Sequence, residues 1–344
     1  MERYIAIDNV CAWPNLTLLP NGEIIATIFN QPCHGAWEGD VECWASTDGG
    51  RSWRYRGTPA PHDPATNRMN VGAGLTGTGE LIVFASGWTL RPTKAEYDAG
   101  KRAPFAGSQV LAPWVSRSAD GGRTWTIIKA FPPAPEPDMC AVIPFGSTGV
   151  AADGSLCISG YCGKLADMRG YNSCYLFRSR DDGRTWGEGA IIGAGGNNET
   201  APLHLGGGRW LAAARKLGQG QGTDLYVSTD DGRTWRNHCV LGLPMQHPAH
   251  LLRLADGRVL LVYGNRCPQM WGIDARISAD EGQTWGPPLR LIELAHSDLG
   301  YPASVQTRDG KVVTAYYLGK SREHHRYHMG VQLWDVEEFF PKPK

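Results

Sequence analysis

The octapeptide Ser228-Thr229-Asp230-Asp231-Gly232-Arg233-Thr234-Trp235 is the strongest indicator of the fold, because its pattern occurs five times along the chain. The copies are spaced by roughly 50 to 70 residues, a period typical of stacked or radially arranged units. The Asp can accept hydrogen bonds from nearby backbone N–H groups and the Gly supplies a positive φ, so the motif predicts a tight turn. The closing Trp is large enough to pin that turn onto the strands. We therefore expect these residues to be structural. The other copies, which also read Ser-x-Asp-x-Gly-x-(Ser/Thr)-Trp, lie at 46–53, 118–125, 179–186 and 278–285.

A second repeated feature, the hairpin turn, gives the number of units. Short Gly-, Asp- or Asn-containing turns flanked by apolar runs predict six β-hairpins. In the first five units a hairpin is followed by a third strand, one octapeptide and a fourth strand. The last unit has a hairpin and a third strand over 325–334 but no octapeptide, and the N-terminal run 3–8 is left over. We therefore predict one all-β domain over 1–344, a six-bladed β-propeller whose N-terminal strand closes the last blade. The hairpin turns lie at 19–23, 77–80, 152–155, 206–209, 255–258 and 308–311.

Composition narrows the partners and the compartment. The 44 Gly and 23 Pro fit many short strands joined by turns. The 34 acidic and 34 basic residues balance, with no basic block, which argues against nucleic acid. No apolar run approaches the ~18 residues of a membrane span, and the start shows no leader peptide. Nine cysteines without C-x-x-C pairs fit reduced thiols, so we expect a cytoplasmic protein, or a secreted or periplasmic one if a leader has been trimmed.

Closure of the ring assigns its two rims. Hairpin turns and octapeptides share one rim, so the other rim collects the starts of first strands, the ends of second strands and the loops that follow them. Residues there converge on the central axis, where we expect the functional site. The candidates on this rim are Ala12, Trp13, His34, Glu38, Asp40, Arg68, Asn70, Trp88, Asp138, Tyr161, Glu199, Arg215, His247, His250, Arg266, Asp298 and Tyr301.

The octapeptides resemble the Asp-box, or BNR repeat, of the sialidase (neuraminidase) superfamily, and further motifs extend that resemblance. An Asn-Glu pair ending at Glu199 opens the first strand of the fourth unit, and Arg215 closes its second strand. A Gly-Asn-Arg run ends at Arg266 in the fifth unit, and a Gly-Tyr pair ends at Tyr301 in the sixth. The resemblance implies that Tyr301 is a catalytic nucleophile, that Glu199 is its base, and that Arg215 and Arg266 bind a substrate carboxylate.

This chemistry is coherent for an acidic sugar. A sialic acid carries a carboxylate on its anomeric carbon, which would repel a carboxylate nucleophile, whereas a neutral tyrosine avoids that repulsion. A free phenol has a pKa near 10, so it needs a neighbouring base. Arginine holds a carboxylate through its planar fork of donors.

The sequence also departs from the family pattern. The first unit reads Cys-Ala-Trp-Pro at 11–14, where the family has its lead arginine. Arg68, at the start of the second unit, is a candidate replacement. Three residues of the loop after the second strand of the first unit are candidates for the acid/base role. We take Asp40 as the candidate over Glu38 and His34. His34 and His247 are candidates to bind substrate hydroxyls.

Several function classes stay open on these observations. The first is a sialidase-type glycoside hydrolase for a terminal sialic acid or hexuronate, with no cofactor and no metal. The histidines at 324, 325 and 328 lack the matching Cys or carboxylate spacing of a metal site. The second is a lyase that uses Tyr301 with His34 or His247 for β-elimination at a uronate. The third is a non-catalytic carbohydrate-binding propeller, because propellers often only bind.

Overall fold

The computed structural model describes residues 1–104, 106–129, 131–165, 167–187, 189–218, 222–320 and 324–341, with the backbone alone at 167–171. Strands account for nearly all of its regular structure, and the described residues include two short helices, α1 (Lys94–Asp98) and α2 (Val336–Phe339). The all-β prediction is therefore confirmed. No helix in these ranges is long and apolar enough to cross a membrane.

Within the described residues the strands form five hydrogen-bonded sheets, four of which have four strands each. In three of these four sheets, consecutive strands pair as an antiparallel meander. The first sheet contains β2 (Ala12–Leu18), β3 (Ile24–Phe29), β4 (Val41–Ser46) and β5 (Arg54–Ala60). The second contains β14 (Asn197–Gly206), β15 (Arg209–Lys216), β16 (Thr223–Ser228) and β17 (Arg236–Leu241). The third contains β18 (Gln246–Arg253), β19 (Val259–Asn265), β20 (Gly272–Ser278) and β21 (Leu289–Glu293).

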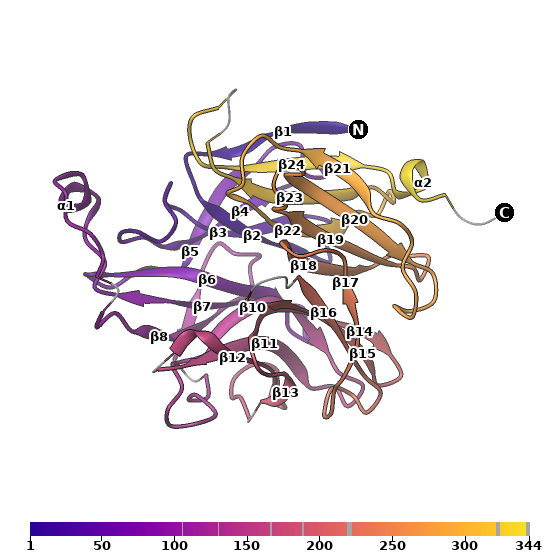
Figure 1. The fold of residues 1–344 in the computed structure, drawn as a ribbon, viewed down its shortest axis with the longest axis horizontal. Coiled ribbons are helices and arrows are strands. Elements are labelled where there is room, and N and C mark those ends of the chain that lie inside the picture. Colours follow the sequence, from indigo (N-terminus) through magenta and orange to yellow (C-terminus); the bar gives the residue numbers. More distant parts are fainter. Residues whose placement is uncertain are drawn as a thin grey trace.

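The fourth four-stranded sheet joins the two ends of the sequence. It has the order β1 (Glu2–Asp8), β24 (His328–Trp334), β23 (Val312–Leu318) and β22 (Leu299–Gln306). Strand β1 pairs antiparallel with β24, from Glu2 opposite Leu333 to Asp8 opposite His328. In Figure 1 the indigo β1 lies beside the yellow β24. The predicted closure by the N-terminal strand is thus confirmed, although β24 begins three residues later than the predicted 325.

The fifth sheet has eight strands, so the prediction of six separate four-stranded blades holds only in part. Two antiparallel meanders are joined through a short parallel pairing of β6 with β10, at Gly72 with Gly146 and Ala73 with Ser147. Small residues at this seam let the two backbones approach closely. In order, the strands are β13 (Ala190–Gly193), β12 (Asp167–Ser179), β11 (Leu156–Lys164), β10 (Ile143–Val150), β6 (Thr66–Leu75), β7 (Leu81–Thr89), β8 (Val110–Ser118) and β9 (Thr126–Ile128).

The core lies between the faces of neighbouring sheets. The second strands are apolar on both faces and are buried along their whole length in β3, β19 and β23. Such continuous apolar runs are typical of strands covered on both sides. One core cluster joins residues of β2 and β3 to residues of β22, β23 and β24, so it packs the first four-stranded sheet against the fourth.

The octapeptides form the predicted turns between third and fourth strands. In the copy at 228–235, Ser228 Oγ donates to Asp230 (2.7 Å) and accepts from the Gly232 N–H (2.9 Å). The backbone N–H of Thr234 also donates to Asp230 (2.9 Å), and its hydroxyl donates to the other carboxylate oxygen (2.6 Å). Each copy therefore closes its own turn with local hydrogen bonds.

The same turns touch the hairpins of the neighbouring unit. The second acidic residue of one copy, Asp182, accepts from the Gly77 N–H of the β6–β7 hairpin (2.6 Å). Asp231 likewise accepts from the Ala152 N–H of the β10–β11 hairpin (3.0 Å). Hairpin turns and octapeptides therefore share one rim, as predicted.

Candidate functional site

On the opposite rim, four first strands share one local irregularity. In each of four described sheets, two residues near the start of the first strand face one residue of the second, which is a β-bulge. Bulges re-aim side chains and are common next to functional sites. The residues that these four bulges present are Trp13, Glu199, His247 and Tyr301. Trp13 (φ +45°) and Tyr301 (φ +46°) also hold a strained left-handed backbone conformation.

Tyr301, Glu199 and Arg215 form the centre of the site. The Tyr301 hydroxyl donates a hydrogen bond to one oxygen of Glu199. Nη1 of Arg215 lies 2.7 Å from the other oxygen of Glu199 and 3.5 Å from the Tyr301 hydroxyl. Arg215 is the single residue opposite the Asn198–Glu199 bulge, so the same irregularity places both members of this ion pair. The predicted contact of Tyr301 with Glu199 is confirmed.

The electrostatics of this centre keep the phenol neutral. Burial, followed by the negative charge of Glu199, raises the pKa of Tyr301 well above its usual value of 10. The charges of Arg215 and Arg266 oppose that rise but do not overcome it. Glu199 itself is buried, with 7% of its surface exposed, and its ion pair with Arg215 supplies the opposite charge that a buried carboxylate needs.

Arg266 lies on the ring of Tyr301. Its guanidinium carbon is 5.5 Å from the ring centroid, within the range of a cation–π contact. Its Nε donates to the Leu299 carbonyl (2.8 Å), and one Nη donates to the Tyr317 hydroxyl (3.2 Å). The structure thus brings both predicted arginines to Tyr301.

Arg215 and His247 each have a buried nitrogen near this centre, Nε and Nδ1, without a partner among the described residues, and so does Trp13 at Nε1. Burial first, and then the charges of Arg215 and Arg266, lower the pKa of His247 to about 3, so its imidazole is neutral at ordinary pH. Buried donors and acceptors are normally satisfied, so these nitrogens are candidates to contact a ligand.

His34 and Asp298 form a second polar group beside the first. Nδ1 of His34 lies 3.6 Å from Asp298 Oδ1. The hydroxyls of Tyr317 (2.6 Å) and Tyr327 donate to the two oxygens of Asp298. Burial alone would raise the pKa of Asp298, but the hydrogen bonds from His34, Tyr317 and Tyr327 outweigh it and hold that pKa well below its usual range.

Trp13 connects the two groups. The ring of His34 meets its indole edge-on at 4.8 Å between centroids, and the Tyr301 ring lies 6.1 Å away. The Tyr317 ring is also an edge-on neighbour, at 6.0 Å. The indole that stands where the family pattern has an arginine therefore forms an aromatic wall of the site.

Asp40 and Arg68 contact residues outside the Tyr301 centre. Asp40 accepts from the backbone N–H of His62 (2.7 Å) and contacts Nδ1 of its ring (2.6 Å). Arg68 is buried, donates to the Ala112 carbonyl (3.0 Å) and stacks 4.0 Å above the Trp114 ring. Burial lowers the pKa of Arg68 to about 10. Among the described residues, no hydrogen bond, ion pair or ring contact joins Asp40 or Arg68 to Tyr301, so their roles stay predictions.

Sequence reasoning missed three aromatic residues of the site. Tyr317 and Tyr327 hold Asp298, and Phe145 lies 6.0 Å from the Tyr301 ring. Tyr317 lies near the end of the second strand of its unit, as Arg215 does in its own, and this place near the rim is the signal that could have revealed it. Tyr327 and Phe145 carry no comparable signal.

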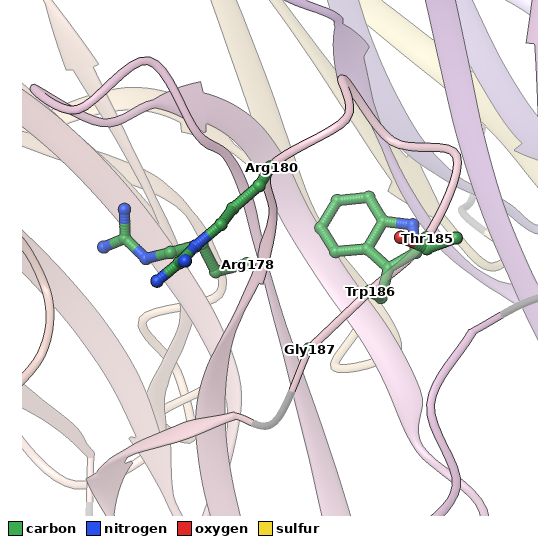
Figure 2. Close-up of a pocket in the computed structure, with 5 residues that line it drawn as sticks. All are labelled: Arg178, Arg180, Thr185, Trp186 and Gly187. Carbon is green, nitrogen blue, oxygen red and sulfur yellow. The ribbon is translucent and has the colours of Figure 1, made fainter.

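A pocket of about 390 Å³ lies at the rim that carries the hairpin turns and the octapeptides. Figure 2 shows Arg178 and Arg180 on one side of it and Trp186 on the other. Its remaining lining residues, Thr185 and Gly187, belong to the octapeptide turn after β12 or follow it directly. Arg178 already pairs with Asp153 at 3.0 Å, so we interpret this pocket as a surface cleft of the turn.

The described residues hold no group of three or more His, Cys, Asp or Glu arranged to bind a metal ion. His324 and His328, from the histidine cluster of the sequence, meet edge-on at 4.9 Å, and His324 contacts Asp8 at 2.6 Å.

The class of protein follows from the sheets and the repeated turns: this is a sialidase-like β-propeller with Asp-box repeats. A BNR repeat-like domain matches residues 100–314, more than half of the chain, so the chain belongs to the BNR repeat-like domain family. No curated protein sequence matches this chain significantly.

Solved structures share the fold at low identity. A protein of unknown function from Dyadobacter fermentans is 23% identical, with a TM-score of 0.78 over 97% of each chain. A Hadza microbial sialidase is 20% identical, with a TM-score of 0.72 over 96% of this chain and 67% of that one. Trypanosoma rangeli sialidase is 14% identical, with a TM-score of 0.66 over 95% of this chain and 54% of that one. The chain therefore spans only about half the length of the trypanosomal protein.

Proposed function

We propose that this protein is a glycoside hydrolase of the sialidase type that acts on a terminal acidic sugar. The observation that carries the proposal is the three-way contact of Tyr301, Glu199 and Arg215. A phenol with a raised pKa becomes a nucleophile only when a base takes its proton, and Glu199 accepts the hydrogen bond of that hydroxyl.

The choice of tyrosine points to the kind of sugar. A substrate with a carboxylate on its anomeric carbon repels a carboxylate nucleophile, and a neutral phenol avoids this cost. Arg215 and Arg266 both contact Tyr301, so their positive charges lie where the acid group of such a substrate would sit. The unpartnered Nε of Arg215 supplies a donor for that group.

The rest of the sugar would meet neutral groups. His247 has a buried nitrogen without a partner among the described residues and an imidazole that stays uncharged, which suits a sugar hydroxyl. Trp13 and Phe145 flank Tyr301 with aromatic surface, which suits the apolar face of a pyranose ring. Since Trp13 stands in the place of an arginine, two guanidiniums rather than three face the acid group. The tyrosine argument favours a sialic acid, and a hexuronate, whose carboxylate is attached to C5, is the second candidate for this smaller clamp.

We also infer that residues 1–344 form one six-bladed domain. The eight-stranded sheet consists of two meanders of four strands, each with its own hairpin and Asp-box, and the parallel pairing that joins them covers only two residue pairs. Counting these meanders as two blades restores the six units of the sequence repeat. An experimental structure in which the two meanders form one continuous blade would overturn this count.

A substrate screen tests the proposed function. We expect the purified protein to release the chromophore from 4-nitrophenyl glycosides of sialic or glucuronic acid and to leave the matching neutral glucoside intact. An unsaturated product that absorbs in the ultraviolet, formed from a uronate polymer, would instead identify a lyase. Calorimetric binding of the free acidic sugars without turnover of any glycoside would identify a binding propeller.

A further inference from the structure

We propose that His34, oriented by Asp298, is the general acid and base that protonates the departing group. This inference rests on the proposed function, because it assigns a role within that reaction. It replaces Asp40, which the sequence favours, with a residue of the same loop.

The position of His34 fits the role. Its side chain is 58% exposed, although its ring packs edge-on against the buried Trp13 indole. Nδ1 faces Asp298, so Nε2 is the nitrogen left to face a substrate. Tyr301 contacts the same indole, and Asp298 precedes Tyr301 by three residues, so the proposed acid and the nucleophile flank one wall of the site.

The hydrogen bonds of Asp298 fix its carboxylate in a position to orient the His34 ring. Tyr317 and Tyr327 fix its two oxygens, and Tyr317 is itself fixed by Arg266. The pKa of Asp298 lies well below its usual range, so the carboxylate stays ionised beside the His34 ring. A carboxylate behind a catalytic histidine sets the tautomer and the orientation of its ring. The titratable and charged groups around this pair are Tyr317, Tyr327, Tyr301, Arg266, Cys11, Cys33 and His296, whose Nδ1 accepts from the Asp298 N–H.

The alternative acid, Asp40, is already occupied. Its Oδ1 contacts both the backbone N–H and the ring Nδ1 of His62. The competing Glu38 accepts from the Ala65 N–H at 2.6 Å and lies 3.8 Å from Nε2 of His62. Both carboxylates therefore stabilise the 62–65 turn, whereas His34 alone of the three lies beside an aromatic neighbour of Tyr301.

The proton transfers balance over two steps. In the first, the Tyr301 oxygen attacks the anomeric carbon and its proton passes to Glu199, while the bond to the departing oxygen breaks and that oxygen takes the Nε2 proton of His34. In the second, neutral His34 takes a proton from a water molecule whose oxygen attacks the anomeric carbon. The Tyr301 oxygen then leaves and recovers its proton from Glu199. Tyr301, Glu199 and His34 therefore end the cycle in the protonation states in which they began it.

The test compares two departing groups on one sugar. A 4-nitrophenolate leaves readily without a proton, whereas a methoxide does not, so loss of a general acid harms the methyl glycoside selectively. We expect His34→Ala to lower kcat/KM for the methyl glycoside on the order of 10² to 10⁴-fold and for the 4-nitrophenyl glycoside less than about 10-fold. The sugar is sialic or glucuronic acid, whichever the screen finds cleaved. His238→Ala, on the outer strand β17, is the matched histidine control and should change neither rate.

A second variant tests the role of Asp298. Asp298→Asn should lower kcat for the methyl glycoside more than kcat for the 4-nitrophenyl glycoside, because it removes the carboxylate that orients the His34 ring, and KM should stay within about twofold. Circular dichroism of each variant checks that it is folded. Equal losses on both glycosides, or a selective loss in Asp40→Asn instead of His34→Ala, would overturn the assignment to His34. A wild-type protein that cleaves no glycoside would overturn the proposed function and this inference together.

Discussion

The two rims of the propeller use polar residues in opposite ways. On the Asp-box rim, the first Asp of each copy accepts hydrogen bonds from a serine or threonine side chain and from the backbone of its own turn. On the other rim, buried nitrogens of Arg215 and His247 have no partner within the described part of the chain, and Trp13 and Tyr301 hold strained backbones.

This contrast separates structural from functional polar groups in this fold. A group that closes its own turn, in the same way five times, stabilises the unit that carries it. A group that occurs once, is buried, and lacks a partner costs folding free energy, and such costs persist chiefly at functional sites. The distinction rests on the first Asp of each copy, since on the Asp-box rim Oδ2 of Asp231 and the indole nitrogens of Trp186 and Trp285 also lack hydrogen-bond partners among the described residues.

The largest effect should come from the nucleophile. Tyr301→Phe removes only the hydroxyl that Glu199 and Arg215 contact, so we expect turnover of the acidic glycoside to fall on the order of 10⁴ to 10⁶-fold. The thermal midpoint should stay near that of the wild type. Tyr55→Phe, at an exposed tyrosine of β5, is the matched control. More than a tenth of wild-type turnover in Tyr301→Phe would end the tyrosine mechanism.

The next effect belongs to the Asp-box rim and concerns stability alone. Trp186 is buried and packs edge-on against Phe84 at 5.1 Å, so Trp186→Ala should cost about 3 to 5 kcal/mol of the free energy of unfolding. Trp235 is only partly buried, and we expect roughly half that cost from Trp235→Ala. Urea titrations give the two values, and activity per folded molecule should stay at the wild-type level. A folded variant without activity would show that this rim takes part in function.

A smaller effect on catalysis is expected when the guanidinium of Arg215 no longer binds the carboxylate of the substrate. Arg215→Lys keeps the charge but removes the planar pair of donors. We expect kcat/KM for the acidic glycoside to fall about 10- to 100-fold, which corresponds to the ~1.5–3 kcal/mol of a hydrogen bond to a charged group. Arg51→Lys, at an exposed Asp-box arginine, is the control. Unchanged kinetics in Arg215→Lys would place the carboxylate elsewhere.

The smallest effect is the pH dependence of the Asp-boxes. Burial raises the pKa of Asp48, but hydrogen bonds from Ser52 and Ser46 lower it to about 2 in the folded protein. Because this folded value lies below the unfolded value near 3.9, the stabilisation is present above about pH 4 and is lost as the pH falls toward 2. The site is largely exposed, so each box should contribute less than about 1 kcal/mol. Asp48→Asn should flatten the fall of the thermal midpoint between pH 4 and pH 2, and a steeper fall would contradict this account.

The sequence predicts the repeated parts of this molecule better than the singular ones. The Asp-boxes and hairpin turns depend on residues close in sequence, so their positions follow from local chemistry. The contact of Tyr301 with Glu199 also follows, because a family resemblance places both. The contacts of Asp298 with Tyr317 and Tyr327 could not be predicted, because a tyrosine in an apolar strand is normally interpreted as a core residue. The stacking of Arg68 on Trp114 depends on packing between β6 and β8, which no local pattern encodes.

The pairing of β1 with β24 has a consequence for assembly. Residue 2 must find residue 333, and pairings this distant form slowly even though their entropic cost grows only slowly with separation. Until β1 arrives, β24 presents an open edge that the β1 of a second molecule fits equally well. We therefore expect refolding at high protein concentration to yield strand-swapped dimers that dilution alone does not dissociate. Size-exclusion chromatography of protein refolded over a range of concentrations would reveal them, and a purely monomeric product at every concentration would show that closure is faster than encounter.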